Sequence, residues 1–83
     1  MELEYLEKTK YPEYTYLKAL YNIGLFYYAN AEYDSAIHFY KRIINRNSDK
    51  SQIGRSYGQI AKCYNRKNQL FKAVTYFNKG IAI

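Results

Sequence analysis

Residues that break helices are scarce in this 83-residue sequence, which has one proline and four glycines. Long helices are therefore permitted almost everywhere between Tyr14 and Ile83. Cysteine is scarcer still: Cys63 stands alone, so no disulfide can form within the chain, and we expect a reducing cytoplasm. Apolar residues make up 48% and charged residues 24% of the chain, which indicates one folded domain with a modest core.

Acidic residues are nearly absent from the C-terminal two thirds of the sequence. From Ser35 onward, Asp49 is the only acid against ten lysines and arginines, and the whole chain carries a net charge of +6. A basic surface of this kind favours acidic partners. The candidates are nucleic acid, an acidic protein face and a peptide carboxylate.

Signals for a membrane, a metal or a reactive thiol are also missing. The longest uncharged stretch, Ala19 to Ala31, is too short to span a bilayer, so we expect no membrane partner. His38 has no cysteine or carboxylate at ligand spacing, which predicts no metal site and no cofactor. Cys63 lies beside Lys62, yet without a nearby base a packed, inert thiol is the favoured interpretation. We predict that the chain is not an enzyme.

A repeat emerges when the sequence is shifted on itself by 37 residues. Small residues then align with small ones and large with large. The aligned positions are Leu20, Ile23, Gly24, Tyr27, Ala36, Tyr40 and Ile43 with Tyr57, Ile60, Ala61, Tyr64, Ala73, Phe77 and Gly80. Within each unit the positions recur at helical spacing on either side of a short turn. The pattern predicts an all-α chain built from two helical hairpins.

Local signals predict where the helices begin and end. We expect the first helix from about Pro12 to Tyr28 and the second from near Asp34, capped by Asp34 or Ser35, to near Asn45. The third follows a cap at Ser48, Asp49 or Ser51 and runs to about Asn65, and the fourth runs from Gln69 to Ile81 or beyond. The predicted units are an N-terminal segment or short helix over 1–11, a first repeat over 12–47 and a second over 48–83.

These residues resemble the tetratricopeptide repeat family over roughly residues 17–83. That family has a large residue, Leu-Gly and Tyr on the first helix, then Ala, a large aromatic and Ala on the second. This sequence departs from the pattern at Ile43, Ser48, Ala61 and Gly80. The resemblance implies a right-handed superhelical stack of two repeats that binds a protein or peptide.

A narrower resemblance concerns the repeat region of Rap-type response-regulator aspartate phosphatases of bacilli and related peptide-sensing regulators. It is carried by the segments 20–25, 33–37 and 76–81. That family's repeats bind short signalling peptides, and a separate N-terminal bundle engages the response regulator. The residues before Pro12 are too few for such a bundle, so we expect no phosphatase activity. The resemblance implies a truncated regulator in bacterial signalling, which sequesters a peptide or pairs with a longer homologue.

The family resemblance also implies a binding surface, because in such arrays the first helix of each repeat lines the concave face. The equivalent positions recur at spacings of three and four, so they form two parallel stripes. The predicted peptide-binding residues are Lys18, Tyr21, Asn22, Leu25, Tyr28, Arg55, Lys62, Asn65 and Arg66, with Gln59 in the same stripe. Amides can hold a peptide backbone, and cations can hold a carboxylate. The alternative is that these are solvated positions on exposed helices.

The C-terminal residues suggest a second surface. Phe77, Ile81 and Ile83 form an apolar stripe with no polar capping helix after it. Repeat arrays usually need about three units to be stable. We therefore predict that a second copy, giving a homodimer, or a larger partner covers this stripe.

The abundance of tyrosine leaves one alternative function open. Twelve tyrosines interleaved with basic residues can stack nucleic-acid bases. Seven of them fall at or beside packing positions: Tyr16, Tyr27, Tyr33, Tyr40, Tyr57, Tyr64 and Tyr76. Protein or peptide binding is therefore the function we favour over nucleic-acid binding.

Overall fold

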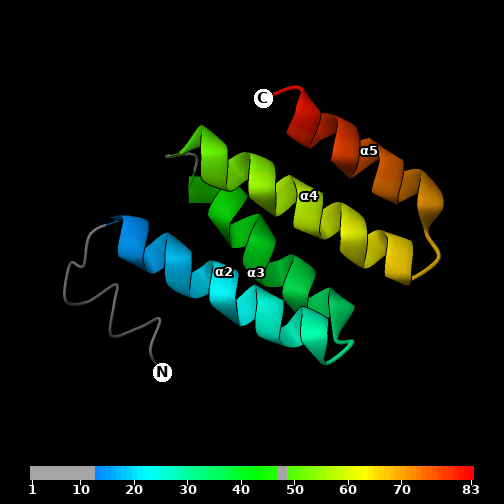
Figure 1. The fold of residues 1–83 in the computed structure, drawn as a ribbon, viewed down its shortest axis with the longest axis horizontal. Helices are drawn as coiled ribbons and strands as arrows, with labels where there is room; N and C mark the ends of the chain where they lie inside the picture. Colours follow the sequence, from blue (N-terminus) through cyan, green and yellow to red (C-terminus); the bar gives the residue numbers. More distant parts are fainter. Residues whose placement is uncertain (1–12, 47–48) are drawn as a thin grey trace.

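The computed structural model describes residues 13–46 and 49–83, which form four helices: α2 (Glu13–Ala29), α3 (Tyr33–Arg46), α4 (Lys50–Arg66) and α5 (Leu70–Ile81). No strand occurs in these ranges, and the all-α fold of two helical hairpins is confirmed. The hairpins α2–α3 and α4–α5 lie side by side, with α2 and α5 on opposite sides of the stack (Figure 1). The predicted segment 1–11, the predicted helix start at Pro12 and the cap candidate Ser48 lie outside the described residues.

The two hairpin turns have the same geometry, 37 residues apart. Ala31 and Asn68 both adopt left-handed backbone angles, with φ of 60° and 61°. In each turn two amide groups donate back to the preceding helix. These bonds are Ala31 N to Tyr28 O and Glu32 N to Tyr27 O, matched by Asn68 N to Asn65 O and Gln69 N to Tyr64 O. This pattern is the Schellman motif, which satisfies the last carbonyls of a helix. The 37-residue period therefore extends to the backbone conformation of the turns.

The sequence predicted the cap of α4 correctly and the cap of α3 incorrectly. Asp49, one of the three predicted cap residues, is the cap of α4. Its side chain accepts a hydrogen bond from Ser51 N at 2.9 Å. For α3 the predicted start near Asp34 is correct within one residue, and only the predicted cap was wrong. This helix begins at Tyr33, so Asp34 and Ser35 lie inside its first turn. The Asp34 carboxylate instead pairs with Lys67 of the second turn.

The core runs between the helices and depends on one close approach. Leu20, Tyr40 and Ile60 are fully buried, one each from α2, α3 and α4. A Cβ atom built on Gly24 would lie 2.5 Å from Tyr40 Cε1, closer than real side chains approach. Glycine at this position is what lets the Tyr40 ring lie against α2.

Polar contacts join the start of α2 to the end of α3. Arg46 donates two hydrogen bonds to the Glu13 carboxylate, at 2.7 and 3.0 Å, and its guanidinium lies 4.5 Å from the Tyr16 ring centre. Arg42 donates to the Tyr16 hydroxyl at 2.7 Å. Both arginines lie near the C-terminal end of α3, where cations complement the helix dipole, and they also bind the neighbouring helix.

None of the helices in the described ranges is both long enough and apolar enough to cross a membrane.

Candidate protein-binding groove

A groove of about 680 Å³ lies between α4 and α5 and reaches Tyr21 of α2 at one end. We call it the α4–α5 groove. Its α4 wall is polar and carries Arg55, Gln59, Lys62 and Asn65, whereas its α5 wall is apolar and carries Leu70, Ala73, Val74 and Phe77. Three of the apolar side chains are more than half exposed, Leu70 at 61%, Val74 at 58% and Phe77 at 56%.

The α5 wall is apolar because its residues occupy core positions of the repeat. Shifted back by 37 residues, Leu70, Val74 and Phe77 fall on Tyr33, Ile37 and Tyr40 of α3. Those three side chains are buried or half-buried in the core that α3 shares with α2 and α4. In the second repeat the equivalent surface has no such cover in the described residues. The chain therefore displays, on α5, the kind of surface that it buries on α3.

The α4 wall carries two cations and two amides. Arg55 and Lys62 are exposed at the groove, and neither α4 nor α5 contains an acidic residue. Gln59 Nε2 donates to the Tyr21 hydroxyl at 3.1 Å, which fixes both groups at one end of the groove. With no carboxylate on either helix to neutralise them, the two cations favour an acidic ligand.

The structure brings together four of the predicted peptide-binding residues and separates the rest. Tyr21, Arg55, Lys62 and Asn65 line the α4–α5 groove. Five do not line it: Lys18, Asn22, Leu25, Tyr28 and Arg66. Tyr28 and Arg66 bind one another, with Arg66 Nε donating to the Tyr28 hydroxyl at 3.2 Å. The two predicted stripes thus lie side by side, but the hollow surface is on the α5 side of α4.

The three residues assigned to self-association also separate. Phe77 lines the α4–α5 groove, so the two predicted surfaces share this residue. Ile81, one turn further along α5, is 68% exposed. Ile83 lies in another depression with Ile44 and Ile53. Peptide binding and self-association through Phe77 would therefore exclude one another.

Sequence reasoning missed Leu70 and Val74. Both are ordinary apolar residues of an amphipathic helix, and nothing local marks them as exposed. The signal that could have identified them is the 37-residue shift, which aligns them with the core positions Tyr33 and Ile37. In the described residues α5 packs on α4 alone, so these two side chains stay exposed.

The other chemically active side chains are accounted for by packing. Cys63 is free and fully buried, and burial raises the pKa of its thiol to about 11, which confirms the packed thiol. His38 is exposed and lies edge-on to Phe39. Over residues 13–46 and 49–83, no three histidine, cysteine or acidic side chains gather where a metal could bind.

Comparison with known families agrees with this geometry. Two family models, both described as tetratricopeptide repeat, match residues 18–49 and residues 54–83. The chain belongs to the tetratricopeptide repeat family. The two matches correspond to the α2–α3 and α4–α5 hairpins, and repeats of this family form protein–protein interaction modules and are generally non-catalytic scaffolds. Comparison with curated proteins and with solved structures gave no match.

The tyrosines of this tetratricopeptide repeat protein serve the packing of the repeats. All seven that the sequence placed at or beside packing positions are buried or half-buried, and Tyr64 stacks on Tyr76 with ring centres 5.3 Å apart. Of the tyrosines in the part of the chain that the structure describes, only Tyr14 is largely exposed. The tyrosines of the described residues therefore do not form an exposed platform for base stacking.

Proposed function

We propose that this chain binds a protein partner by holding an apolar, acidic segment of it in the α4–α5 groove. The observation that supports the proposal is the groove's pair of walls, one apolar with Leu70, Val74 and Phe77 and one acid-free with Arg55 and Lys62. A ligand that matches both walls has an apolar stripe flanked by carboxylates. An amphipathic helix or a short peptide has this chemistry.

The apolar wall would supply most of the binding free energy. Burying an exposed valine, leucine or phenylalanine side chain completely contributes about 1.5–3 kcal/mol. The three side chains are already partly covered, so each contributes about half of that amount, less the cost of immobilising the ligand. Arg55 and Lys62 would add selectivity and speed more than affinity, because they are solvent-exposed and salt screens them.

Binding of this kind acts by occupancy, without a chemical step. The resemblance to peptide-sensing regulators supports a short signalling peptide as the segment that is held. It also supports pairing with a longer homologue, since a repeat of that homologue would present the same type of helix. In either case the chain regulates by making a segment unavailable to its other partners.

Two synthetic amphipathic helical peptides test the proposal. They share one leucine-rich face and differ in having glutamate or lysine on the opposite face. Fluorescence anisotropy should show tighter binding of the glutamate peptide, with affinity that falls as salt is added. Val74→Glu should weaken binding about tenfold or more, because it places a charge in the apolar wall.

The matched control is Phe71→Glu on the same helix. Phe71 is 88% exposed and does not line the groove, so this variant carries the same added charge and should bind as the wild type does. Equal loss in both variants, or no preference between the two peptides, would contradict the assignment of the groove.

A further inference from the structure

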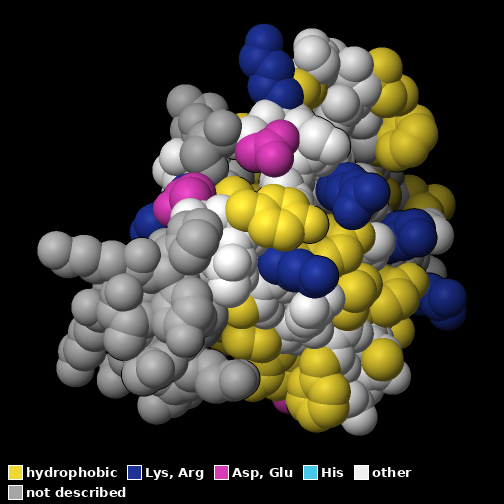
Figure 2. Space-filling model, turned by 60° about the vertical axis from the view of Figure 1, so that its left-hand side comes forward, with side chains coloured by type: hydrophobic (Ala, Val, Ile, Leu, Met, Phe, Trp, Pro, Cys, Tyr) yellow, Lys and Arg dark blue, Asp and Glu magenta, His cyan; other side chains and the backbone are white. Residues whose placement is uncertain are grey.

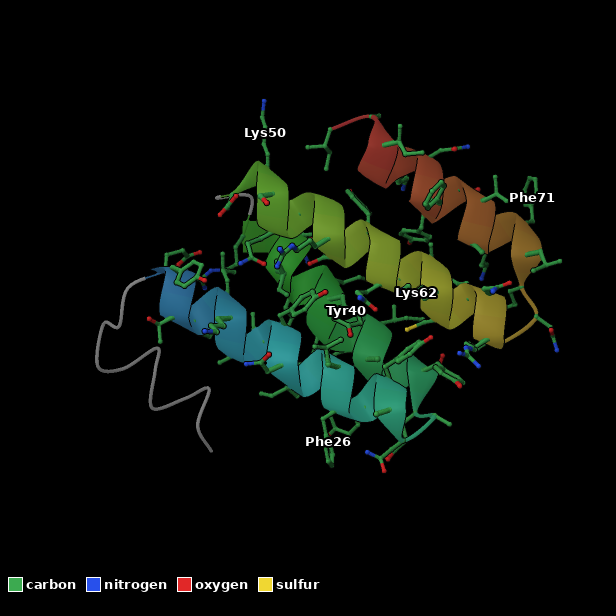
Figure 3. All side chains as sticks on the ribbon, in the orientation of Figure 1. Phe26, Tyr40, Lys50, Lys62 and Phe71 are labelled. Carbon is green, nitrogen blue, oxygen red and sulfur yellow. The ribbon has the colours of Figure 1, made fainter. Side chains whose placement is uncertain are left out.

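The stack has an exposed apolar surface on each of its two outer helices. On α5 it is the wall of the α4–α5 groove. On α2 it centres on Phe26, which is 63% exposed. Figure 3 shows Phe26 projecting from the side of α2 that faces away from α4, whereas Phe71 marks α5 on the opposite side of the molecule. The two surfaces therefore belong to the two outer helices, on opposite sides of the stack.

The contact between α3 and α4 shows which helix fits a surface like the α5 wall. Ser56, Ile60 and Cys63 lie on one face of α4, and all three are fully buried. Ile60 and Cys63 belong to the same core cluster as Ile37 and Tyr40 of α3. These α3 positions correspond, 37 residues on, to Val74 and Phe77. A helix that presents a small residue followed by two apolar residues at this spacing is thus what the repeat uses to cover its neighbour.

The helix α2 carries that face in the same register. Shifted by 37 residues, Ser56, Ile60 and Cys63 fall on Ala19, Ile23 and Phe26. These lie on one side of α2, since the spacing of four and three residues keeps them on a single face. Ala19 and Ile23 are half-buried and Phe26 is exposed. The side of α2 that would meet a preceding repeat is thus built like the side of α4 that meets α3.

We propose that the α4–α5 groove receives α2 of a second copy of this chain, which packs on α5 as α4 packs on α3. The proposal rests on the apolar wall of the groove in the proposed function and names a partner for it. The helix α2 contributes an apolar face, without the flanking carboxylates of an acidic peptide. The groove, at about 680 Å³, has room for Phe26, which is larger than Cys63 at the equivalent position. The 37-residue repeat then continues from one copy into the next.

This contact joins two different surfaces, so it is heterologous. Each copy keeps a free α2 at one side and a free groove at the other, and the assembly grows with concentration instead of stopping at a dimer. Copies with a net charge of +6 repel one another, so added salt should strengthen assembly. An acidic peptide in the groove should block assembly, and salt should weaken that peptide's binding.

Mixing two variants with opposite defects tests the proposal. Phe26→Glu removes the α2 face and leaves the groove, whereas Phe77→Glu alters the groove and leaves the α2 face. In sedimentation velocity the wild type should gain mass with concentration, and each variant alone should stay monomeric. An equal mixture should form a dimer of one Phe26→Glu and one Phe77→Glu chain that grows no further. Phe71→Glu should assemble as the wild type does.

Circular dichroism checks that each variant keeps its helices. If Phe77→Glu loses its helices, Leu70→Glu replaces it as the groove variant. Dimers of Phe26→Glu alone would overturn the proposal, because they would show α5 pairing with α5. A wild type that stays monomeric at all concentrations and salts would also overturn it. The peptide titration separates failure of this proposal from failure of the proposed function. If a monomeric wild type still binds the glutamate peptide, and Val74→Glu weakens that binding, the groove is a binding site but α2 of a second copy is not its ligand.

Discussion

In the first repeat, α3 lies between α2 and α4, whereas in the second repeat α5 packs on α4 alone among the described residues. The turns and the spacing of the packing positions are the same in both. The difference is in exposure: Tyr40 is fully buried and its counterpart Phe77 is 56% exposed. A second helix of this fold buries one part of its apolar face on its own hairpin. The other part of that apolar face is buried in the core where another helix packs on it, and is available for binding where none does.

The largest effect that would sharpen this comparison is expected from Gly24→Ala. The new Cβ would lie 2.5 Å from Tyr40 Cε1, and Tyr40 is enclosed on all sides. We expect a loss of about 1–2 kcal/mol in unfolding free energy, because overpacking outweighs the better helix propensity of alanine. Chemical denaturation measures it.

Gly58→Ala is the matched substitution in the second repeat. A Cβ on Gly58 meets no atom within 4 Å, so only helix propensity changes. This variant should gain about 0.5–1 kcal/mol. The same sign in both variants would mean that the Tyr40 ring can move, and that the first repeat is less tightly packed than the structure shows.

An intermediate effect is expected from Tyr40→Phe, which gives α3 the residue that α5 carries at position 77. The Tyr40 hydroxyl is buried with no hydrogen-bond partner in the structure, and burial raises its pKa above the usual range for tyrosine. Removing an unpaired buried hydroxyl should stabilise the fold by about 1 kcal/mol. Thermal unfolding would show this as a midpoint about 4–8 °C higher.

Tyr21→Phe is the control for that prediction. The Tyr21 hydroxyl accepts a hydrogen bond from Gln59 at 3.1 Å, so its removal should lower stability by about 0.5–1.5 kcal/mol. If Tyr40→Phe destabilises the chain as Tyr21→Phe does, the Tyr40 hydroxyl has a partner in solution.

The smallest effect is expected at the two turns. Ala31 and Asn68 have the same left-handed φ, which alanine adopts at a cost of about 1–2 kcal/mol and asparagine at a lower one. Ala31→Gly should therefore stabilise the chain by about 0.5–1 kcal/mol, after the entropy cost of glycine. Asn68→Gly should change the unfolding midpoint less. Equal gains would show that asparagine relieves no strain here.

Much of the fold was predictable because its signals are local or periodic. The spacing of positions such as Leu20 and Gly24 predicted helices, and the polar clusters between them predicted turns. The cap of α3 was not found correctly, because Asp34 looks like a cap in sequence and its carboxylate instead pairs with Lys67, 33 residues away. An ion pair between turns of different repeats leaves no local signal.

The candidate site was predictable in part. The stripe on α4, with Arg55, Lys62 and Asn65, follows from helical spacing and the family resemblance. The opposite wall was missed at Leu70 and Val74, since an exposed and a buried apolar residue look the same in sequence. Figure 2 shows another face of the molecule, on which Lys and Arg side chains lie between exposed hydrophobic ones.

By itself, the sequence determined the four helices, the 37-residue period and the positions of the short turns, because these depend on neighbouring residues and on a pattern that occurs twice in the chain. Only the tertiary structure decided which apolar face is covered, because an apolar residue is buried or exposed according to which helices pack over it. It also decided that Phe77 and Lys62 share one groove. Those side chains come from different helices, and only packing α5 on α4 brings them together.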